Sequence, residues 1–134
     1  MKLLKCIIKE WLLPIIAAII LAALINNFLF YQVKVPSSSM YPTIKIGDKI
    51  TVTRVYNKSK LKRGDIIVFY SYELKERLIK RLIGIPGDEV IVKDNGHVFI
   101  NGSEIAEPYV VYKEDLNKKF KVPKNKYLFF GDNR

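Results

Sequence analysis

The sequence predicts a mainly β protein in which an N-terminal transmembrane helix precedes a small β-rich domain. Residues 11–31 form an uncharged and almost entirely apolar run, and a run of this length can cross a hydrocarbon core of about 30 Å as a helix. Beyond residue 34, short apolar stretches alternate with Gly, Asn and Asp turns, and no helical period is sustained. With 134 residues in total, only one modest domain can follow the helix.

The apolar run is interpreted as an uncleaved signal anchor. Pro14 lies near its start, where a missing N–H is tolerated. Aromatic residues that favour a membrane interface follow at its far end: Phe28, Phe30 and Tyr31. A cleavable signal peptide would need small residues after the run, and the residues there are large or polar. A buried helix of a soluble protein is the alternative, but so small a domain could hardly cover every face of it.

Lysines before the run set the expected orientation. Lys2, Lys5 and Lys9 precede it closely, so the positive-inside rule places the N-terminus in the cytoplasm. At the cell membrane, residues 1–10 would then be the cytoplasmic N-terminus, residues 11–31 the transmembrane anchor and residues 32–134 the extracytoplasmic β-rich domain.

The chain is strongly basic. Its net charge is +10, from 23 Lys and Arg residues against 13 Asp and Glu residues. Such a surplus suits anionic lipid headgroups or nucleic acid, although a solvated lysine-rich surface explains it as well. We expect the lipid bilayer, in particular its anionic lipids, to be a partner, and we expect no nucleic acid.

The β-rich domain is expected to form a meander or partial barrel. Its predicted strands are residues 49–55, 65–70, 78–85, 89–92, 97–100 and 127–130. Asn95 and Gly96 separate two apolar stretches and tolerate positive φ, which predicts a hairpin. Asn101 and Gly102 predict a second tight turn. Residues 112–126 are polar and lysine-rich, so they are expected to form a surface excursion.

Two polar segments are candidates for chemistry. Residues 37–43 place three serines before a proline, a composition that by itself predicts a turn or linker. Lys80 and Arg81 interrupt an apolar strand, and because successive side chains point to opposite faces, one of them must enter the core if one face is core. Burial lowers the pKa of a lysine from about 10.4, and a neutral amine can activate a serine hydroxyl. The alternative is that Lys80 lies on the solvated face of an edge strand.

Other catalytic chemistries have few candidate residues. His97 is the only histidine, and it directly follows the predicted Asn-Gly turn, where an exposed polar residue is expected. Cys6 is the only cysteine, so no disulfide and no cysteine cluster for zinc can form within one chain. We therefore expect no metal and no cofactor, and if the chain is a hydrolase, lysine is the available base.

Four segments, in order, resemble the conserved boxes of the type I signal peptidases, the bacterial Ser-Lys leader peptidases of peptidase family S26. They are similar to the nucleophile box, the strand box that follows, the box of the general-base lysine and the opening of the last box: residues 36–43, 63–69, 80–88 and 131–134. Each box alone is a weak signal. Four in the right order behind an N-terminal anchor are jointly very specific.

The resemblance implies a role for each matched residue. Ser39 would be the nucleophile and Lys80 its general base. The hydroxyl of Ser37 and the N–H of Ser39 would form the oxyanion hole, in which losing one donor typically costs about 2.7–4 kcal/mol of transition-state stabilisation. The other matched residues would support the site: Met40, Pro42, Thr43, Arg81, Gly131 and Asp132.

The resemblance also implies an activity. It predicts a membrane-bound serine endopeptidase that removes signal peptides from exported preproteins after small residues, without a cofactor, and binds them as an added strand. In the family the last box continues to a serine and an acidic residue that support the lysine, so a domain that stops at Arg134 is expected to be incomplete. The alternatives are a catalytically inactive, truncated signal peptidase fragment and a membrane-tethered basic binding module.

Overall fold

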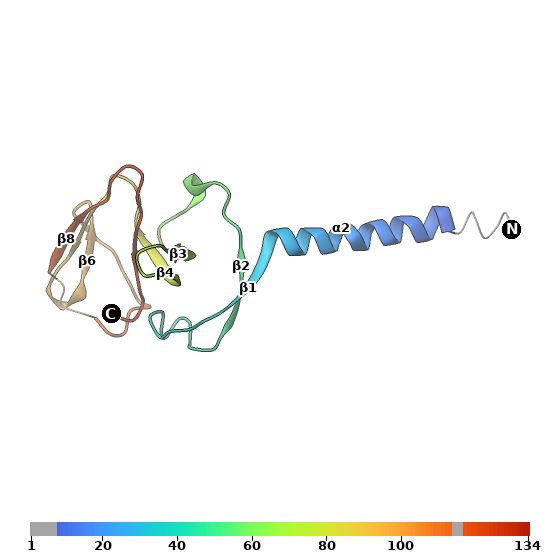
Figure 1. Ribbon diagram of the computed structural model, residues 1–134. Helices are drawn as coiled ribbons and strands as arrows, with labels where there is room; N and C mark the ends of the chain where they lie inside the picture. Colours follow the sequence, from blue (N-terminus) through green and yellow to red (C-terminus); the bar gives the residue numbers. More distant parts are fainter. Residues whose placement is uncertain (1–7, 114–116) are drawn as a thin grey trace. The chain divides into compact units, whose positions relative to one another are not determined.

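The computed structural model describes residues 8–113 and 117–134, which fall into two compact units. The first unit comprises residues 1–33, described from Ile8 onward, together with Ile50–Tyr56. The second comprises Lys34–Lys49 and Asn57–Arg134. Figure 1 shows the elements of each unit.

The first unit is built on an apolar helix. A π-helical turn, η1 (Ile8–Leu12), leads into α2 (Leu13–Leu29), which carries Pro14 in its first turn. The span Lys9–Leu29 is long and apolar enough to cross a membrane. The prediction of a helix through residue 31 was two residues too long, because Phe30 is already extended (φ −119°, ψ 144°) and begins a strand. That strand is β1 (Phe30–Lys34), which pairs with β2 (Lys49–Thr53).

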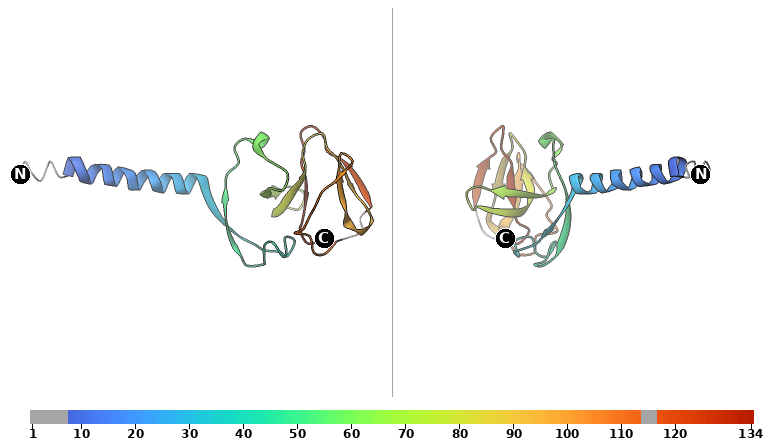
Figure 2. Two further views of the ribbon diagram at one scale, coloured as in Figure 1. Left: turned by 180° about the vertical axis from the view of Figure 1, so that it is seen from behind. Right: turned by 45° about the vertical axis from the view of Figure 1, so that its right-hand side comes forward.

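The second unit contains two antiparallel sheets, which Figure 2 shows from two further directions. The first sheet has the order β3-β4-β9, with bounds Ile66–Ser71, Glu76–Gly84 and Leu128–Phe130. The second has the order β7-β6-β5-β8, with bounds Ser103–Glu104, Val98–Ile100, Glu89–Val92 and Lys118–Lys121. Two short 3-10 turns complete the described elements: η2 (Lys58–Lys60) and η3 (Asp94–Gly96).

The core of the second unit joins both sheets. It consists of buried β-branched side chains from β4, β5, β6 and the residue after β8: Ile83, Val90, Val92, Val98, Ile100 and Val122. Burial alternates along β5 and β6, as a half-buried strand requires. Gly84 ends β4 where space is short, since a Cβ there would lie 2.9 Å from Val122 and 3.0 Å from Val90.

Both predicted turns are confirmed. Asn95 and Gly96 have φ angles of 70° and 67° between β5 and β6, and these strands pair as an antiparallel hairpin. Asn101 and Gly102 have φ angles of 52° and 86° in the turn between β6 and β7. In both turns Asn and Gly accept the left-handed conformation that other residues rarely adopt.

The predicted surface excursion over residues 112–126 was wrong in part. Within it, β8 pairs antiparallel with β5, whereas residues 114–116 lie outside the described part of the chain. Phe120 packs against the core, while Lys119 on the other face forms an ion pair of 2.9 Å with Glu89. The lysine-rich composition therefore marks an edge strand, where charged side chains discourage pairing with another chain.

Candidate active site

Ser39 lies in a loop of consecutive turns between β1 and β2. The loop is closed by two backbone hydrogen bonds of 2.9 Å, from the N–H of Tyr41 to the carbonyl of Ser38 and from the N–H of Ile44 to the carbonyl of Met40. The Met40 side chain is only 1% exposed and packs in the core. Ser39 itself is half-buried, and the loop that contains it is anchored by the buried Met40.

Two of the predicted support and oxyanion residues lie beside Ser39. The hydroxyl of Ser37 lies 3.4 Å from the Oγ of Ser39 and donates toward it. Pro42 is half-buried in the next turn and follows a cis peptide bond. Both candidate oxyanion donors, the hydroxyl of Ser37 and the N–H of Ser39, therefore lie within a three-residue segment.

The residues after β9 hold the Ser39 loop through its backbone. The N–H of Asn133 donates to the carbonyl of Ser39 at 3.1 Å, and its side-chain amide donates to the carbonyl of Ser38 at 3.2 Å. Gly131 approaches so closely that a Cβ there would lie 2.4 Å from the carbonyl oxygen of Ser39. This contact explains glycine at position 131 on steric grounds, because any side chain would displace the loop.

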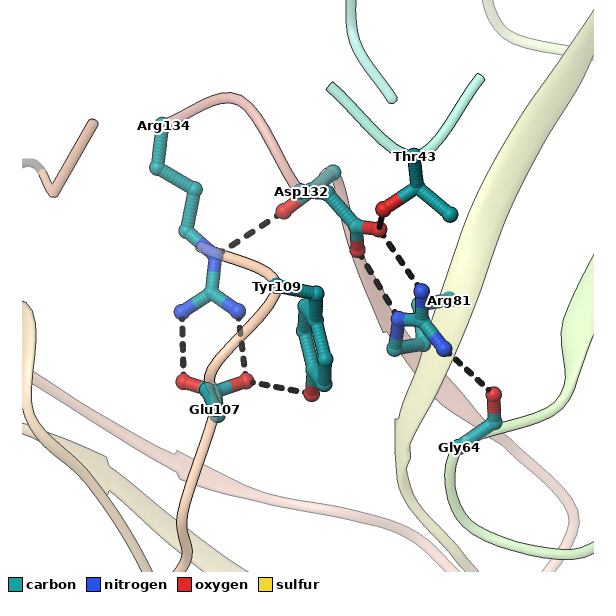
Figure 3. Close-up of polar contacts among 8 residues, drawn as sticks. Thr43, Gly64, Arg81, Glu107, Tyr109, Asp132 and Arg134 are labelled. Atoms are coloured by element: carbon teal, nitrogen blue, oxygen red, sulfur yellow. Dashed lines mark hydrogen bonds and ion pairs between the residues drawn. The ribbon is translucent and has the colours of Figure 1, made fainter. Parts of the chain in front are cut away.

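Asp132 connects the Ser39 loop to strand β4 (Figure 3). Its fully buried carboxylate accepts two hydrogen bonds from Arg81, at 2.9 Å from Nε and 2.7 Å from Nη2, and one of 2.5 Å from the hydroxyl of Thr43. A carboxylate can be buried only with such charged and bidentate partners. Because Arg81 directly follows Lys80, and Thr43 follows Ser39 by four residues, one carboxylate fixes both candidate catalytic segments.

Lys80 lies in β4 opposite Ile67 of β3, and strand alternation sends its side chain to the face opposite Arg81. It is half-buried, between the two environments that the sequence allowed. Burial lowers the pKa of Lys80 from its ordinary value, and the nearby charge of Glu76 partly opposes this shift. The environment thus shifts Lys80 toward the neutral amine that a general base requires.

A second buried ion pair beside the first was missed by sequence reasoning. Glu107 pairs with Arg134 at 2.6 Å, and the hydroxyl of Tyr109 donates to the same carboxylate at 2.9 Å (Figure 3). No local pattern signals this pair, because its two members lie 27 residues apart. His97, by contrast, is exposed as expected and pairs with Glu104 at 2.5 Å.

A serine in a fixed loop and a half-buried lysine in β4, a strand that Asp132 joins to this loop through Arg81 and Thr43, are the two groups that a serine hydrolase with a lysine base requires. The family described as signal peptidase, peptidase S26, matches residues 8–134. Signal peptidase I P of Bacillus subtilis subsp. natto is 44% identical, with 97% of this chain and 76% of that protein covered. Signal peptidase I T of Bacillus subtilis (strain 168) is 41% identical, with 93% and 70% covered.

Among solved structures, a signal peptidase I from Enterococcus faecalis V583 is similar to this chain, with 34% identity and a TM-score of 0.47. The similarity covers 56% of this chain and 79% of that one. From the family match and the relatives, the chain belongs to the signal peptidase family, peptidase S26, and its class is that of the serine endopeptidases. The resemblance seen in the sequence and the mainly β fold behind an apolar helix are both confirmed.

Proposed function

We propose that this chain is a membrane-anchored endopeptidase that removes signal peptides from exported preproteins, with Ser39 as nucleophile and Lys80 as general base. The observation that carries the proposal is the buried carboxylate of Asp132, which ties the strand of Lys80 to the loop of Ser39. Membership in the signal peptidase family supports the activity. Cleavage after small residues is part of the proposal and rests on the family resemblance.

In the first half of the reaction, the neutral amine of Lys80 accepts the hydroxyl proton of Ser39 as its Oγ attacks the scissile carbonyl carbon. Negative charge develops on the carbonyl oxygen, where the N–H of Ser39 and the hydroxyl of Ser37 can donate to it. The intermediate collapses when the Lys80 ammonium protonates the leaving amine. This step releases the new N-terminus of the mature protein and leaves the signal peptide as an ester on Ser39.

The second half hydrolyses the ester. The amine of Lys80, neutral again, accepts a proton from a water molecule whose oxygen attacks the ester carbonyl. Lys80 then returns this proton to the departing Oγ of Ser39, and the signal peptide leaves with a free carboxylate. Because one amine must accept and donate a proton in each half, its pKa has to lie near the working pH, and the burial of Lys80 moves it in that direction.

Membrane attachment would bring the site to its substrate. The apolar span Lys9–Leu29 supports a transmembrane anchor. Its preceding lysines favour a cytoplasmic N-terminus and an extracytoplasmic β-rich domain, although Lys2 and Lys5 lie outside the described residues. Ser39 follows Leu29 by ten residues, which span at most roughly 33–36 Å when fully extended. The nucleophile would therefore stay near the surface where a signal peptide emerges, and the charge of +10 would favour anionic lipids.

The test is cleavage of a preprotein inserted in lipid vesicles by the parent chain, Ser39→Ala, Lys80→Ala and the matched control Ser38→Ala. Ser38 serves the loop through its carbonyl, which alanine retains. We expect the control to cleave like the parent, and the first two variants to lose on the order of 10⁴-fold or more in kcat.

Each alternative predicts a different result. A parent chain that floats with vesicles and binds preprotein but never cleaves it would be an inactive fragment. Binding to anionic vesicles that depends on salt, with no affinity for preprotein, would indicate the basic binding module. Cleavage that survives in Ser39→Ala or Lys80→Ala would refute the proposed pair of catalytic residues.

A further inference from the structure

Resting on the proposed function, we infer that Glu107 and Tyr109, in the connection between β7 and β8, are positioning residues for the Ser39–Lys80 site. Neither residue belongs to the four boxes that resemble the family. Both lie in the second unit, beside Arg81, Asp132 and Arg134 (Figure 3).

Glu107 positions the chain segment that holds Ser39. Its side chain is 5% exposed, and its two carboxylate oxygens accept from the guanidinium of Arg134 at 3.0 Å and 2.6 Å. Arg134 in turn donates from Nε to the carbonyl of Gly131 at 2.9 Å. Gly131 lies so near the carbonyl of Ser39 that a Cβ on it would be 2.4 Å from the oxygen. The buried carboxylate of Glu107, through its two hydrogen bonds with Arg134, therefore fixes the turn at Gly131 that lies against the Ser39 loop.

Tyr109 positions the strand that carries Lys80. The Cζ of Arg81 lies 3.9 Å from the centroid of the Tyr109 ring, a cation–π contact. The guanidinium is held at its edges by the carboxylate of Asp132 and by the carbonyl of Gly64 at 2.9 Å. The ring adds a restraint perpendicular to these, because the planar hydrogen bonds leave the faces of the guanidinium open.

The Tyr109 hydroxyl links the two restraints. It donates to Glu107 at 2.9 Å, so the ring that covers Arg81 is oriented by the carboxylate that holds Arg134. Burial raises the pKa of Tyr109, and the charge of Glu107 raises it further, so the hydroxyl remains a hydrogen-bond donor. Two ion pairs from distant parts of the sequence are thereby held in one geometry.

Stability alone is a weak explanation for this arrangement. Replacing a buried ion pair by apolar residues of similar volume is often neutral or stabilising. Unlike an apolar pair, the Glu107–Arg134 pair fixes the orientation of both side chains, because each of its hydrogen bonds has a preferred geometry. The consequence is a fixed relation between the carbonyl of Ser39 and the backbone of Lys80.

The test compares Glu107→Gln, Tyr109→Leu and Tyr109→Phe in the full chain in detergent micelles. Glu104→Gln and Tyr112→Leu are matched controls, since these side chains are exposed and the substitutions keep the backbone contacts. The readouts are preprotein cleavage and hydrogen exchange of the Asn133 amide, whose N–H binds the carbonyl of Ser39.

We expect Glu107→Gln and Tyr109→Leu to lower kcat by about 10- to 100-fold with little change in KM, because misplacement by about 1 Å costs up to that amount. Exchange of the Asn133 amide should become faster in both variants. Tyr109→Phe keeps the ring over Arg81 and loses only the bond to Glu107, so its kcat should lie between those of the parent and Tyr109→Leu. Both controls should match the parent in both readouts.

The inference is overturned if the parent cleaves and these variants lose only thermal stability, with parental kcat and parental exchange at Asn133. A parent that does not cleave would refute the proposed function, and exchange at Asn133 would then decide the inference alone. If Glu107→Gln fails to fold, the two Tyr109 variants still test the inference. It requires kcat to fall, and exchange of the Asn133 amide to become faster, from the parent to Tyr109→Phe to Tyr109→Leu. Equal values in all three proteins refute the inference.

Discussion

Gly131→Ala would show how strongly the residues after β9 fix Ser39, the proposed nucleophile. The new Cβ would lie 2.4 Å from the carbonyl oxygen of Ser39, whereas ordinary contact begins at 3.4 Å, so one backbone segment must move by about 1 Å. No rotamer relieves the clash, because the backbone fixes the position of a Cβ and the atom that it meets is a backbone carbonyl oxygen. A shift of this size can cost about 100-fold in rate, and overpacking costs typically about 1–3 kcal/mol of stability. We expect Gly131→Ala to lose about 100-fold in rate and about 1–3 kcal/mol in the free energy of unfolding.

The assay is kcat/KM on a membrane-inserted preprotein, at a temperature where circular dichroism shows the variant to be folded. Gly84→Ala is the matched control, because its Cβ would crowd the side chains of Val122 and Val90 at 2.9 Å and 3.0 Å in the core. It should lower the melting temperature and leave the rate per folded molecule near that of the parent. Parental kcat/KM in Gly131→Ala, or an equal loss in Gly84→Ala, would refute the reasoning.

Two further predictions concern charge. Burial lowers the pKa of Lys80, so kcat/KM should rise with pH at values below the ordinary pKa of lysine. Because Glu76 opposes this shift, Glu76→Gln should move the rising limb of the pH profile to lower pH. A pH profile that is the same in Glu76→Gln and in the parent would contradict Lys80 as the general base. Asp132→Asn leaves Arg81 without its buried partner and should cost about 3–5 kcal/mol in chemical denaturation. Lys119→Ala, which breaks only the exposed pair with Glu89, should cost less than about 1 kcal/mol. Equal losses in these two variants would contradict the prediction.

The fold was predictable where the signal is local. The Asn-Gly turns were found from sequence because their backbone conformation depends on the two residues themselves. Strand β8 was missed because its lysines resemble a loop, and only its pairing with β5 and the contact of Phe120 with the core reveal it. The end of α2 was misplaced because Phe30 and Tyr31 suit a strand as well as a membrane interface.

The proposed site could be suggested from the sequence only through the family resemblance. By composition, the serines before Pro42 indicate a turn, and the structure does place them in turns. What distinguishes Ser39 is its support by Gly131 and Asn133, which follow it by more than 90 residues. The roles of Glu107 and Tyr109 are equally non-local, because one partner is Arg134 and the other is Arg81. No window of neighbouring residues contains that information.

The order of Lys80 and Arg81 in β4 separates two requirements that conflict. A base must be able to lose its proton, whereas an ion pair with a buried carboxylate must keep its charge. Strand alternation satisfies both, because it sends Arg81 to Asp132 on one face and Lys80 to a half-buried position on the other. Exchanging the two residues would put a guanidinium, which does not deprotonate, at the position of the proposed base. It would also give Asp132 the point charge of an ammonium in place of a bidentate guanidinium. The exchange should therefore remove the proposed base and, at the same time, loosen the connection between β4 and the Ser39 loop.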